Sequence, residues 1–187
     1  GFVDTLISAC EIAEKGSNLV TIGITPNYPE TGYGYIKYNE EKPEGKSFTV
    51  DSFVEKPDLD TAKKYLESGN YLWNSGMFIW KLSTINECYE KFLPEMYYSL
   101  NEIEKSIGTA SEDETLNSIF PDLENISIDY GVMEKSDNIY IIPGNFGWDD
   151  VGSWLAVSRV NETDSDENII GGNVVSLDVK NCIIEGS

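Results

Sequence analysis

The sequence contains no histidine and only three cysteines, and these absences exclude several kinds of active site. Without histidine, neither a Ser-His triad nor a histidine general base can be built. Cys10, Cys88 and Cys182 are far apart and odd in number, which argues against a zinc cluster and against a disulfide framework. A few scattered thiols are typical of a reducing compartment, so we expect a cytoplasmic protein.

Basic residues are also scarce, and this limits the possible partners. The chain has 13 Lys and Arg against 33 Asp and Glu, a formal net charge of −20. Such a chain repels nucleic acid and anionic membranes, because phosphate binding needs basic side chains. No apolar run approaches the ~20 residues of a membrane span, and the first residues lack the basic start of a signal peptide. We expect neither a nucleic acid nor a membrane as partner.

What is present is an alternation of helix and strand patterns, which is typical of the α/β class. Apolar residues recur at helical spacing over residues 3–13, and the unbroken apolar run 19–24 is typical of a strand buried on both faces. A helix that leads into such a strand is half of a βαβ unit whose first strand is missing. We therefore expect a layered α/β sheet with helices on both faces, truncated at its N-terminus.

Glycine, proline and capping residues predict the elements that follow. The pattern predicts a hairpin with strands at 34–38 and 47–54 around a loop at 39–46, and a short helix that begins at Asp58 or Asp60 and ends at Gly69. It further predicts strands at 77–80 and 139–142, helices begun by Ser83 and by Pro94, an exposed turn at 108–115 and a helix over 152–160.

The end of the chain has a different character. Residues 161–168 form a charged linker, and the short apolar segments 173–177 and 181–185 follow it. We predict a partial domain over residues 1–160. Residues 161–187 would be a linker and the start of a β-rich, β-helix-like module.

Five motifs occur in a fixed order: TGYGYI (31–36), FVEKP (53–57), WNSGMFIW (73–80), SIDYGVMEKS (127–136) and GWDDVGSW (147–154). Together they resemble the mannose-1-phosphate guanylyltransferases, a family of sugar nucleotidyltransferases. The resemblance implies a Rossmann-like, three-layer nucleotidyltransferase domain. It also implies GMP transfer from GTP to mannose 1-phosphate, which yields GDP-mannose and pyrophosphate, with Mg²⁺ as cofactor. A homodimer is a further expectation.

The resemblance assigns sugar-binding roles to four residues. Taken alone, Glu55 and Lys56 read as a solvated charge pair at the exit of a strand, but the family places both against the sugar. Asn74 is either a turn residue or a reader of sugar hydroxyls, and the resemblance favours the second interpretation. Gly34 is either a strand bend or a point where a ligand approaches the backbone closely. We predict that all four residues bind substrate.

The adjacent acids Asp149 and Asp150 lie on a glycine-flanked turn, where a carboxylate can hold a hard cation or simply begin a helix. The family pattern Trp-x-Asp-x-Gly selects Asp150 as the Mg²⁺ ligand and leaves the role of Asp149 open. Asp129 is interpreted as a residue that begins a helix. The part played by Lys135 also stays open.

A family loop of the form GxGxRxxP, which binds nucleotide phosphates, does not occur in the sequence, nor does the family's early metal-binding Asp. We therefore assign no catalytic residue and expect the 187-residue chain alone to be inactive. Two alternatives stay open: another sugar-1-phosphate nucleotidyltransferase, or a non-catalytic, regulatory relative. The retention of the sugar and metal residues argues against the regulatory relative.

Overall fold

The structure is a computed structural model that describes residues 1–152 and 154–186, apart from the side chains of residues 42, 44 and 155. The chain forms two compact units, Gly1–Phe146 and Gly147–Ser187, each described by itself. The predicted domain boundary after residue 160 falls later than this division and stays a prediction. No helix in the described part of the chain is both long and apolar enough to cross a bilayer.

The first unit is built around a helix and a strand that lie where the sequence predicts them. Helix α1 spans Phe2–Glu14 and strand β1 spans Leu19–Ile24, and all six residues of β1 are buried. The inner face of α1 packs Ala9 and Ile12 against Val20 of β1 and Ile142 of strand β5. This burial of apolar surface fixes α1 on one face of the sheet.

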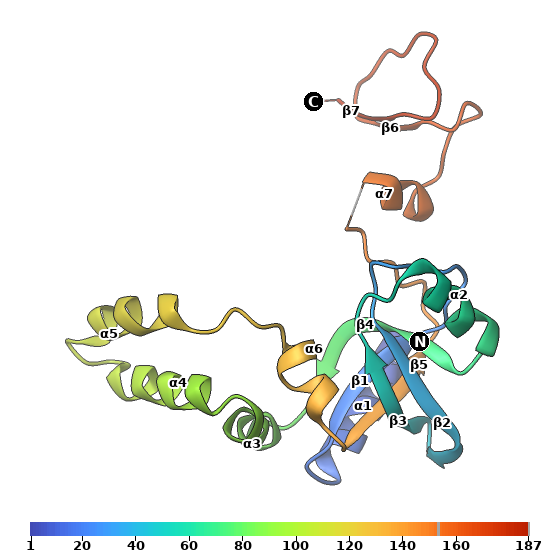
Figure 1. Cartoon of the computed structure of the whole chain (residues 1–187). Coiled ribbons are helices and arrows are strands. Elements are labelled where there is room, and N and C mark those ends of the chain that lie inside the picture. Colours follow the sequence, from blue (N-terminus) through green and yellow to red (C-terminus); the bar gives the residue numbers. More distant parts are fainter. Residues whose placement is uncertain (153, 187) are drawn as a thin grey trace. The chain divides into compact units, whose positions relative to one another are not determined.

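Five strands form a sheet that closes on itself in the order β1-β4-β2-β3-β5 (Figure 1). Strand β5 is parallel to β1, whereas the other neighbours are antiparallel. Two residue pairs, Phe48 with Ile141 and Thr49 with Tyr140, join β3 to β5 and close the sheet. The bounds are β2 Tyr35–Glu44, β3 Ser47–Val54, β4 Tyr71–Ile79 and β5 Ile139–Gly144.

Two strands are longer than the sequence pattern predicts. The predicted loop 39–46 is wrong, because β2 continues to Glu44 and only Gly45 and Lys46 make the turn. The predicted strand 77–80 is also wrong in its start, because β4 begins at Tyr71. The extended end of the β2–β3 hairpin carries polar, exposed residues, so it has none of the alternation by which a half-buried strand is recognised.

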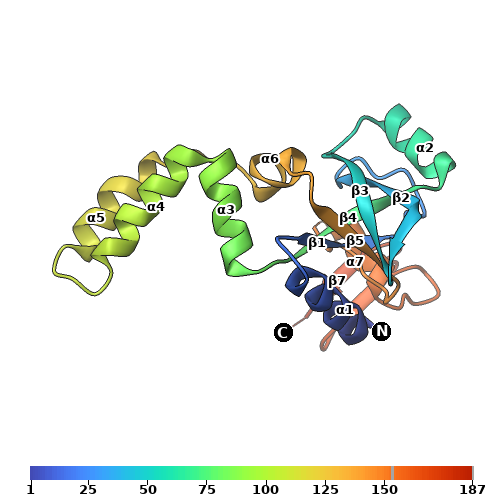
Figure 2. The same ribbon diagram turned by 90° about the horizontal axis from the view of Figure 1, so that it is seen from below.

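Helix α2 spans Leu59–Ser68 and confirms its predicted ends. The Asp58 side chain accepts a hydrogen bond from Thr61 N at 2.7 Å, and Gly69 ends the helix with φ 76°. Between β4 and β5 the chain forms α3 (Leu82–Phe92), α4 (Pro94–Ser106), α5 (Glu112–Ile119) and the short helix α6 (Ile128–Gly131), with 3₁₀ turns at Phe120–Asp122 and Met133–Lys135. In both views α4 and α5 extend away from the sheet (Figures 1 and 2).

Pro94 begins α4 as predicted, but two other helix starts differ from the prediction. Helix α3 begins after Lys81 rather than at Ser83. Helix α5 begins at Glu112 and so takes in part of the predicted turn 108–115. Its first turn holds Glu112, Asp113 and Glu114, and carboxylates stabilise the positive end of a helix dipole.

The second unit contains helix α7 (Trp154–Val160) and two short parallel strands, β6 (Ile169–Gly171) and β7 (Ile183–Glu185). The apolar segment 173–177 contains no strand, whereas β7 lies within the segment 181–185 and β6 precedes both segments. Asn168, a buried side chain, accepts from Cys182 N at 3.1 Å and donates to Val179 O at 2.9 Å. This amide connects the residue before β6 to the segment that leads into β7.

Candidate functional site

Strand register brings three of the predicted site residues to one end of the sheet. β2 lies between β3 and β4, and Tyr35 at its start pairs with Val54 of β3 and Trp73 of β4. The neighbours of these three residues are Gly34, Glu55 and Asn74, which therefore lie in one row. The backbone N–H of Asn74 donates to the carbonyl of Gly34 at 2.8 Å.

Gly34 allows the Glu55 carboxylate to pack closely against the backbone in the middle of this row. A Cβ atom placed on Gly34 would lie 2.5 Å from Glu55 Oε2 and 3.2 Å from Asn74 Cβ. Both distances are shorter than ordinary contacts, so a side chain at this position would displace the Glu55 carboxylate. Glycine at position 34 therefore permits the close approach of Glu55 and Asn74 to the backbone.

Glu55 carries the most unusual electrostatics of the row. Its Oε2 atom is buried and has no hydrogen-bond partner in the described part of the chain, while Lys56 Nζ lies 3.3 Å from Oε1. Burial raises the pKa of the Glu55 carboxyl; the Lys56 ammonium opposes the shift, and the carboxylates of Asp129 and Glu134 add to it. A buried acceptor without a donor is rare in native proteins, so Glu55 is poised for a donor from a ligand.

Lys56 is held in an unusual backbone conformation. Its φ is 45°, in the left-handed region that non-glycine residues seldom adopt. Such a residue costs about 1–3 kcal/mol and persists only where its surroundings fix it, often at a binding site. Its side chain is 62% exposed, so the ammonium can meet a phosphate in solvent.

Asn74 is held by contacts on both sides of its amide. Nδ2 donates to Asp129 Oδ1 at 3.0 Å, and Oδ1 accepts from Gly76 N at 3.2 Å. The hydroxyl of Thr21 lies 3.4 Å from Asn74 Oδ1 and 3.4 Å from Met77 O. The amide therefore has a fixed orientation.

Asp129 is the residue of this site that the sequence did not reveal. Ser127 is the N-cap residue before α6, Asp129 lies in the first turn of α6, and the Asp129 side chain accepts from Asn74, which is distant in the chain. Its interpretation as a residue that begins a helix is therefore incomplete. The only signal in the sequence is its place in SIDYGVMEKS, and no local spacing connects it to Asn74.

The adjacent acids of the second unit differ sharply from each other. Arg159 Nε donates to Asp149 Oδ2 at 2.6 Å, and a second guanidinium nitrogen donates to Oδ1 at 2.9 Å. The Asp150 side chain is exposed and has no partner among the residues that the structure describes. Asp150 thus offers a free carboxylate, and Asp149 does not.

The oxygen donor at Asp150 fits a magnesium ion, which commonly takes one or two carboxylates and fills its remaining positions with water and substrate phosphates. Within residues 1–152 and 154–186, no group of three or more His, Cys, Asp or Glu residues could hold a metal by itself. The chain would therefore supply only part of the coordination. Asp150 lies in the second unit, and the row of Gly34, Glu55 and Asn74 lies in the first.

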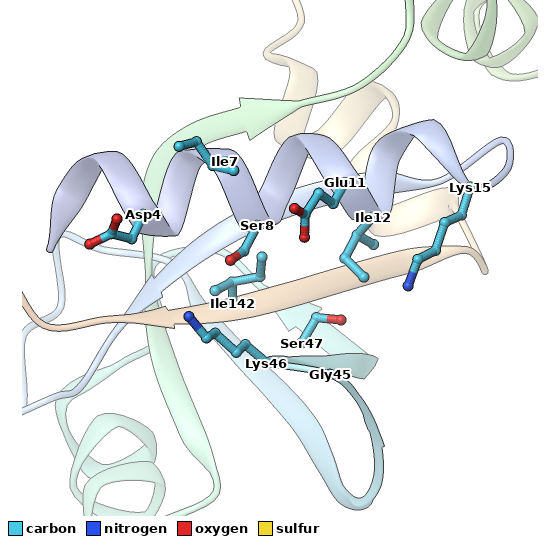
Figure 3. A pocket seen from close by; sticks show the side chains of 10 residues that line it. All are labelled: Asp4, Ile7, Ser8, Glu11, Ile12, Lys15, Gly45, Lys46, Ser47 and Ile142. Carbon is cyan, nitrogen blue, oxygen red and sulfur yellow. The ribbon is translucent and has the colours of Figure 1, made fainter.

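Two hollows in the first unit are lined by other residues and hold none of the predicted sugar-site residues. One, of about 370 Å³, is bordered by α1, the Gly45–Lys46 turn and Ile142, and Figure 3 shows Glu11 and Lys46 beside it. The other, of about 380 Å³, lies at the junction of α3 and α4 and includes Lys135. Both signs of charge line the first hollow, so it has no evident preference for a charged ligand.

Comparisons with known proteins identify the family and the fold. A family model described as nucleotidyl transferase matches residues 2–167. The chain is 42% identical over 185 residues to the alginate biosynthesis protein AlgA of Pseudomonas syringae pv. tomato, and 40% identical over 192 residues to the mannose-1-phosphate guanylyltransferase of Salmonella montevideo. A solved structure of a protein from Thermus thermophilus, titled mannose-1-phosphate geranyltransferase, superposes with a TM-score of 0.82 at 36% identity.

These matches cover nearly all of this chain but much less of each relative. They span 97% of this chain and 38% of the AlgA protein, and 98% of this chain and 40% of the Salmonella enzyme. The superposition covers 99% of this chain and 52% of the solved chain. This chain thus corresponds to about two fifths of the length of these curated relatives.

Proposed function

The chain belongs to the nucleotidyl transferase family, and on this premise we propose that the intact protein transfers GMP from GTP to mannose 1-phosphate. A phosphate oxygen of the sugar phosphate attacks the α-phosphorus of GTP, the bond to the β-phosphate oxygen breaks, and pyrophosphate leaves. GDP-mannose is the second product. A homodimer and a cytoplasmic location stay predictions.

The observation that carries the proposal is the buried, unpartnered Oε2 of Glu55, which packs beside Gly34 in the row that also holds Asn74. A sugar presents hydroxyl groups, which donate as well as accept, and a carboxylate oxygen is a strong acceptor for them. Asn74 lies in the same row with an amide. These residues bind and orient the hexose.

Lys56 would meet the phosphate of the sugar phosphate. Its ammonium is exposed and lies next to Glu55, so one residue pair addresses the two ends of the substrate: a carboxylate for hydroxyls and a cation for phosphate. Held in place, the sugar phosphate attacks as an oriented nucleophile, and positioning is a main source of rate in phosphoryl transfer.

Asp150 would hold Mg²⁺ through a carboxylate oxygen, and the bound ion would neutralise charge on the phosphates. Asp149 is occupied by Arg159 and takes no part in that role. The loop that binds nucleotide phosphates in the family does not occur in these 187 residues. We therefore propose that this chain alone binds mannose 1-phosphate but does not catalyse the transfer.

The test is pyrophosphate release by the intact protein with each pairing of mannose 1-phosphate or glucose 1-phosphate and GTP or UTP. The proposal expects the fastest release with mannose 1-phosphate and GTP, and none from the 187-residue chain alone. Preference for another sugar phosphate or another base would identify a different sugar nucleotidyltransferase. Binding of mannose 1-phosphate without release by the intact protein would identify the regulatory alternative.

A further inference from the structure

The side-chain amide of Asn74 meets one group that can only donate and one that can only accept. The backbone N–H of Gly76 donates to Asn74 Oδ1 at 3.2 Å, and the Asp129 carboxylate accepts from Asn74 Nδ2 at 3.0 Å. An amide carries its acceptor and its donors on opposite atoms. Both contacts therefore select the same one of the two orientations of the amide.

These contacts determine what Asn74 still offers to a ligand. Its oxygen meets Gly76 N–H and lies 3.4 Å from the Thr21 hydroxyl, and one of its two N–H groups is bound to Asp129. The second N–H remains, and it is a donor. On the other side of Gly34 in the same row, the unpartnered Oε2 of Glu55 is an acceptor. The row thus holds one donor and one acceptor.

We propose that Asp129 is a positioning residue of the sugar site, which holds Asn74 as a donor so that the site selects a hydroxyl that accepts from Asn74 and donates to Glu55. This inference rests on the proposed function. Asp129 acts through Asn74 and through the orientation of its amide. A group that cannot both accept and donate, such as a hydrogen atom in a deoxy sugar, leaves Glu55 without its partner.

A purely structural role for Asp129 would also explain the hydrogen bond, because the bond connects α6 to β4. A reciprocal exchange separates the two roles. In the double variant Asn74→Asp with Asp129→Asn, the new Asn can donate to the new Asp, and the new Asp can still accept from Gly76. The connection between α6 and β4 is kept, but position 74 no longer has an N–H for the sugar.

The experiment measures mannose 1-phosphate binding by calorimetry and thermal unfolding of the intact protein. We expect the double variant to unfold within a few degrees of wild type but to bind mannose 1-phosphate roughly tenfold or more weakly, since a buried donor becomes an acceptor. Asp129→Ala should also bind roughly tenfold more weakly. Asp129→Asn should stay within about threefold of wild type, because its amide oxygen still accepts from Asn74.

Wild-type affinity in the double variant or in Asp129→Ala would overturn the inference. A second readout needs no sugar: the side-chain amide protons of Asn74 in a ¹⁵N–¹H spectrum should shift in Asp129→Ala and much less in Asp129→Asn. Amide signals that do not move in Asp129→Ala would overturn the inference even where the sugar binds. If Asp129→Ala does not fold, mannose 1-phosphate binding by the double variant and by Asp129→Asn decides between the positioning role and the structural role. A wild-type protein that binds no mannose 1-phosphate would overturn the proposed function instead.

Discussion

Two acidic sites of this molecule differ in whether their carboxylates have hydrogen-bond partners. In the first unit, one oxygen of Glu55 has no donor, and burial raises the pKa of its carboxyl, with a smaller contribution from the carboxylates of Asp129 and Glu134. In the second unit, Asp149 is bound through both oxygens by Arg159, while Asp150 stands exposed beside it. Within the described residues, the protein thus supplies a partner for Asp149 and withholds one from Asp150 and from one oxygen of Glu55.

The difference indicates which carboxylates are prepared for a ligand. A paired acid such as Asp149 is already satisfied, so it serves the local structure. A carboxylate without a donor is either solvated, as at Asp150, or costly to bury, as at Glu55. The motif Trp-x-Asp-x-Gly selects Asp150 through the family resemblance, and the structure adds a physical difference, the pairing of Asp149 with Arg159.

The largest expected effect is at Asp150. Asp150→Asn should lower turnover by the intact protein roughly 100-fold or more, because charge neutralisation by a bound metal contributes several kcal/mol. Asp149→Asn is the matched control, since it removes the same charge one residue away and should change turnover far less. A Mg²⁺ titration of both variants measures the effect. Equal losses would show that the two acids do not differ in function.

The next effect concerns the sugar pocket itself. Glu55→Ala and Asn74→Ala should each weaken mannose 1-phosphate by about 1–3 kcal/mol and leave GTP nearly unaffected, because each removes a partner of a buried hydroxyl. Steady-state kinetics with each substrate varied in turn provide the measurement. Unchanged KM and kcat/KM for the sugar phosphate in both variants would assign these residues a structural role.

Gly34→Ala tests the position of the Glu55 carboxylate. The new methyl group would lie 2.5 Å from Glu55 Oε2, which is the end of a flexible side chain, so the fold should adapt while the carboxylate is displaced. We expect a rise of roughly tenfold in the KM for mannose 1-phosphate. Gly16→Ala is the control, because its nearest contact is an ordinary 3.4 Å. An unchanged KM would place the sugar elsewhere.

Glu55→Gln should stabilise the protein at neutral pH while it weakens sugar binding. The folded-state pKa of Glu55 lies above its ordinary value of 4.5, so the protonated form favours folding and the charged form opposes it. Protonation of Glu55 therefore adds to the free energy of unfolding at low pH, and this contribution is lost as the pH rises through the folded-state pKa.

We therefore expect Glu55→Gln to gain on the order of 1 kcal/mol of unfolding free energy at about pH 7. The gain should shrink as the pH falls toward 4.5, because Glu55 is then protonated in the wild type. Glu104→Gln, an exposed change of the same charge on α4, is the control. Urea unfolding of both variants at several pH values provides the measurement. A gain that is independent of pH would show that burial of the charge is not its cause.

The smallest expected effect is at Arg159. Arg159→Gln removes the partner of Asp149 and should cost no more than about 1 kcal/mol, since the arginine is 37% exposed and surface ion pairs contribute little. A double-mutant cycle with Asp149→Asn gives the coupling energy of the pair. A coupling near zero would show that Asp149 is not restrained by Arg159.

Much of the fold follows from local sequence patterns. The family resemblance read from five motifs is confirmed, as are the α/β class, the buried strand 19–24 and the ends of α2 at Asp58 and Gly69. These features are local: an unbroken apolar run, a capping side chain, a glycine with positive φ. The polar end of the β2–β3 hairpin has no such pattern, so the sequence predicts a loop where the structure has strands.

The site is predictable only in part, for the same reason. Motifs draw attention to Gly34, Glu55 and Asn74, and strand register brings these three together. Their roles in binding, like that of Lys56 and of Asp150, stay predictions. Asp129 meets Asn74 only through the tertiary fold, so no spacing in the sequence could connect them.

The closed sheet also bears on how the strand edges of this protein are kept from pairing with other chains. A strand with unpaired backbone groups is a template for another chain, and closure removes such edges. Here closure depends on two residue pairs between β3 and β5, whereas the other neighbours pair over longer ladders. Because that ladder is short, a small local opening there would expose two strand edges at once. We therefore expect aggregation on partial unfolding to begin at Phe48 and Ile141 rather than at the ligand pocket.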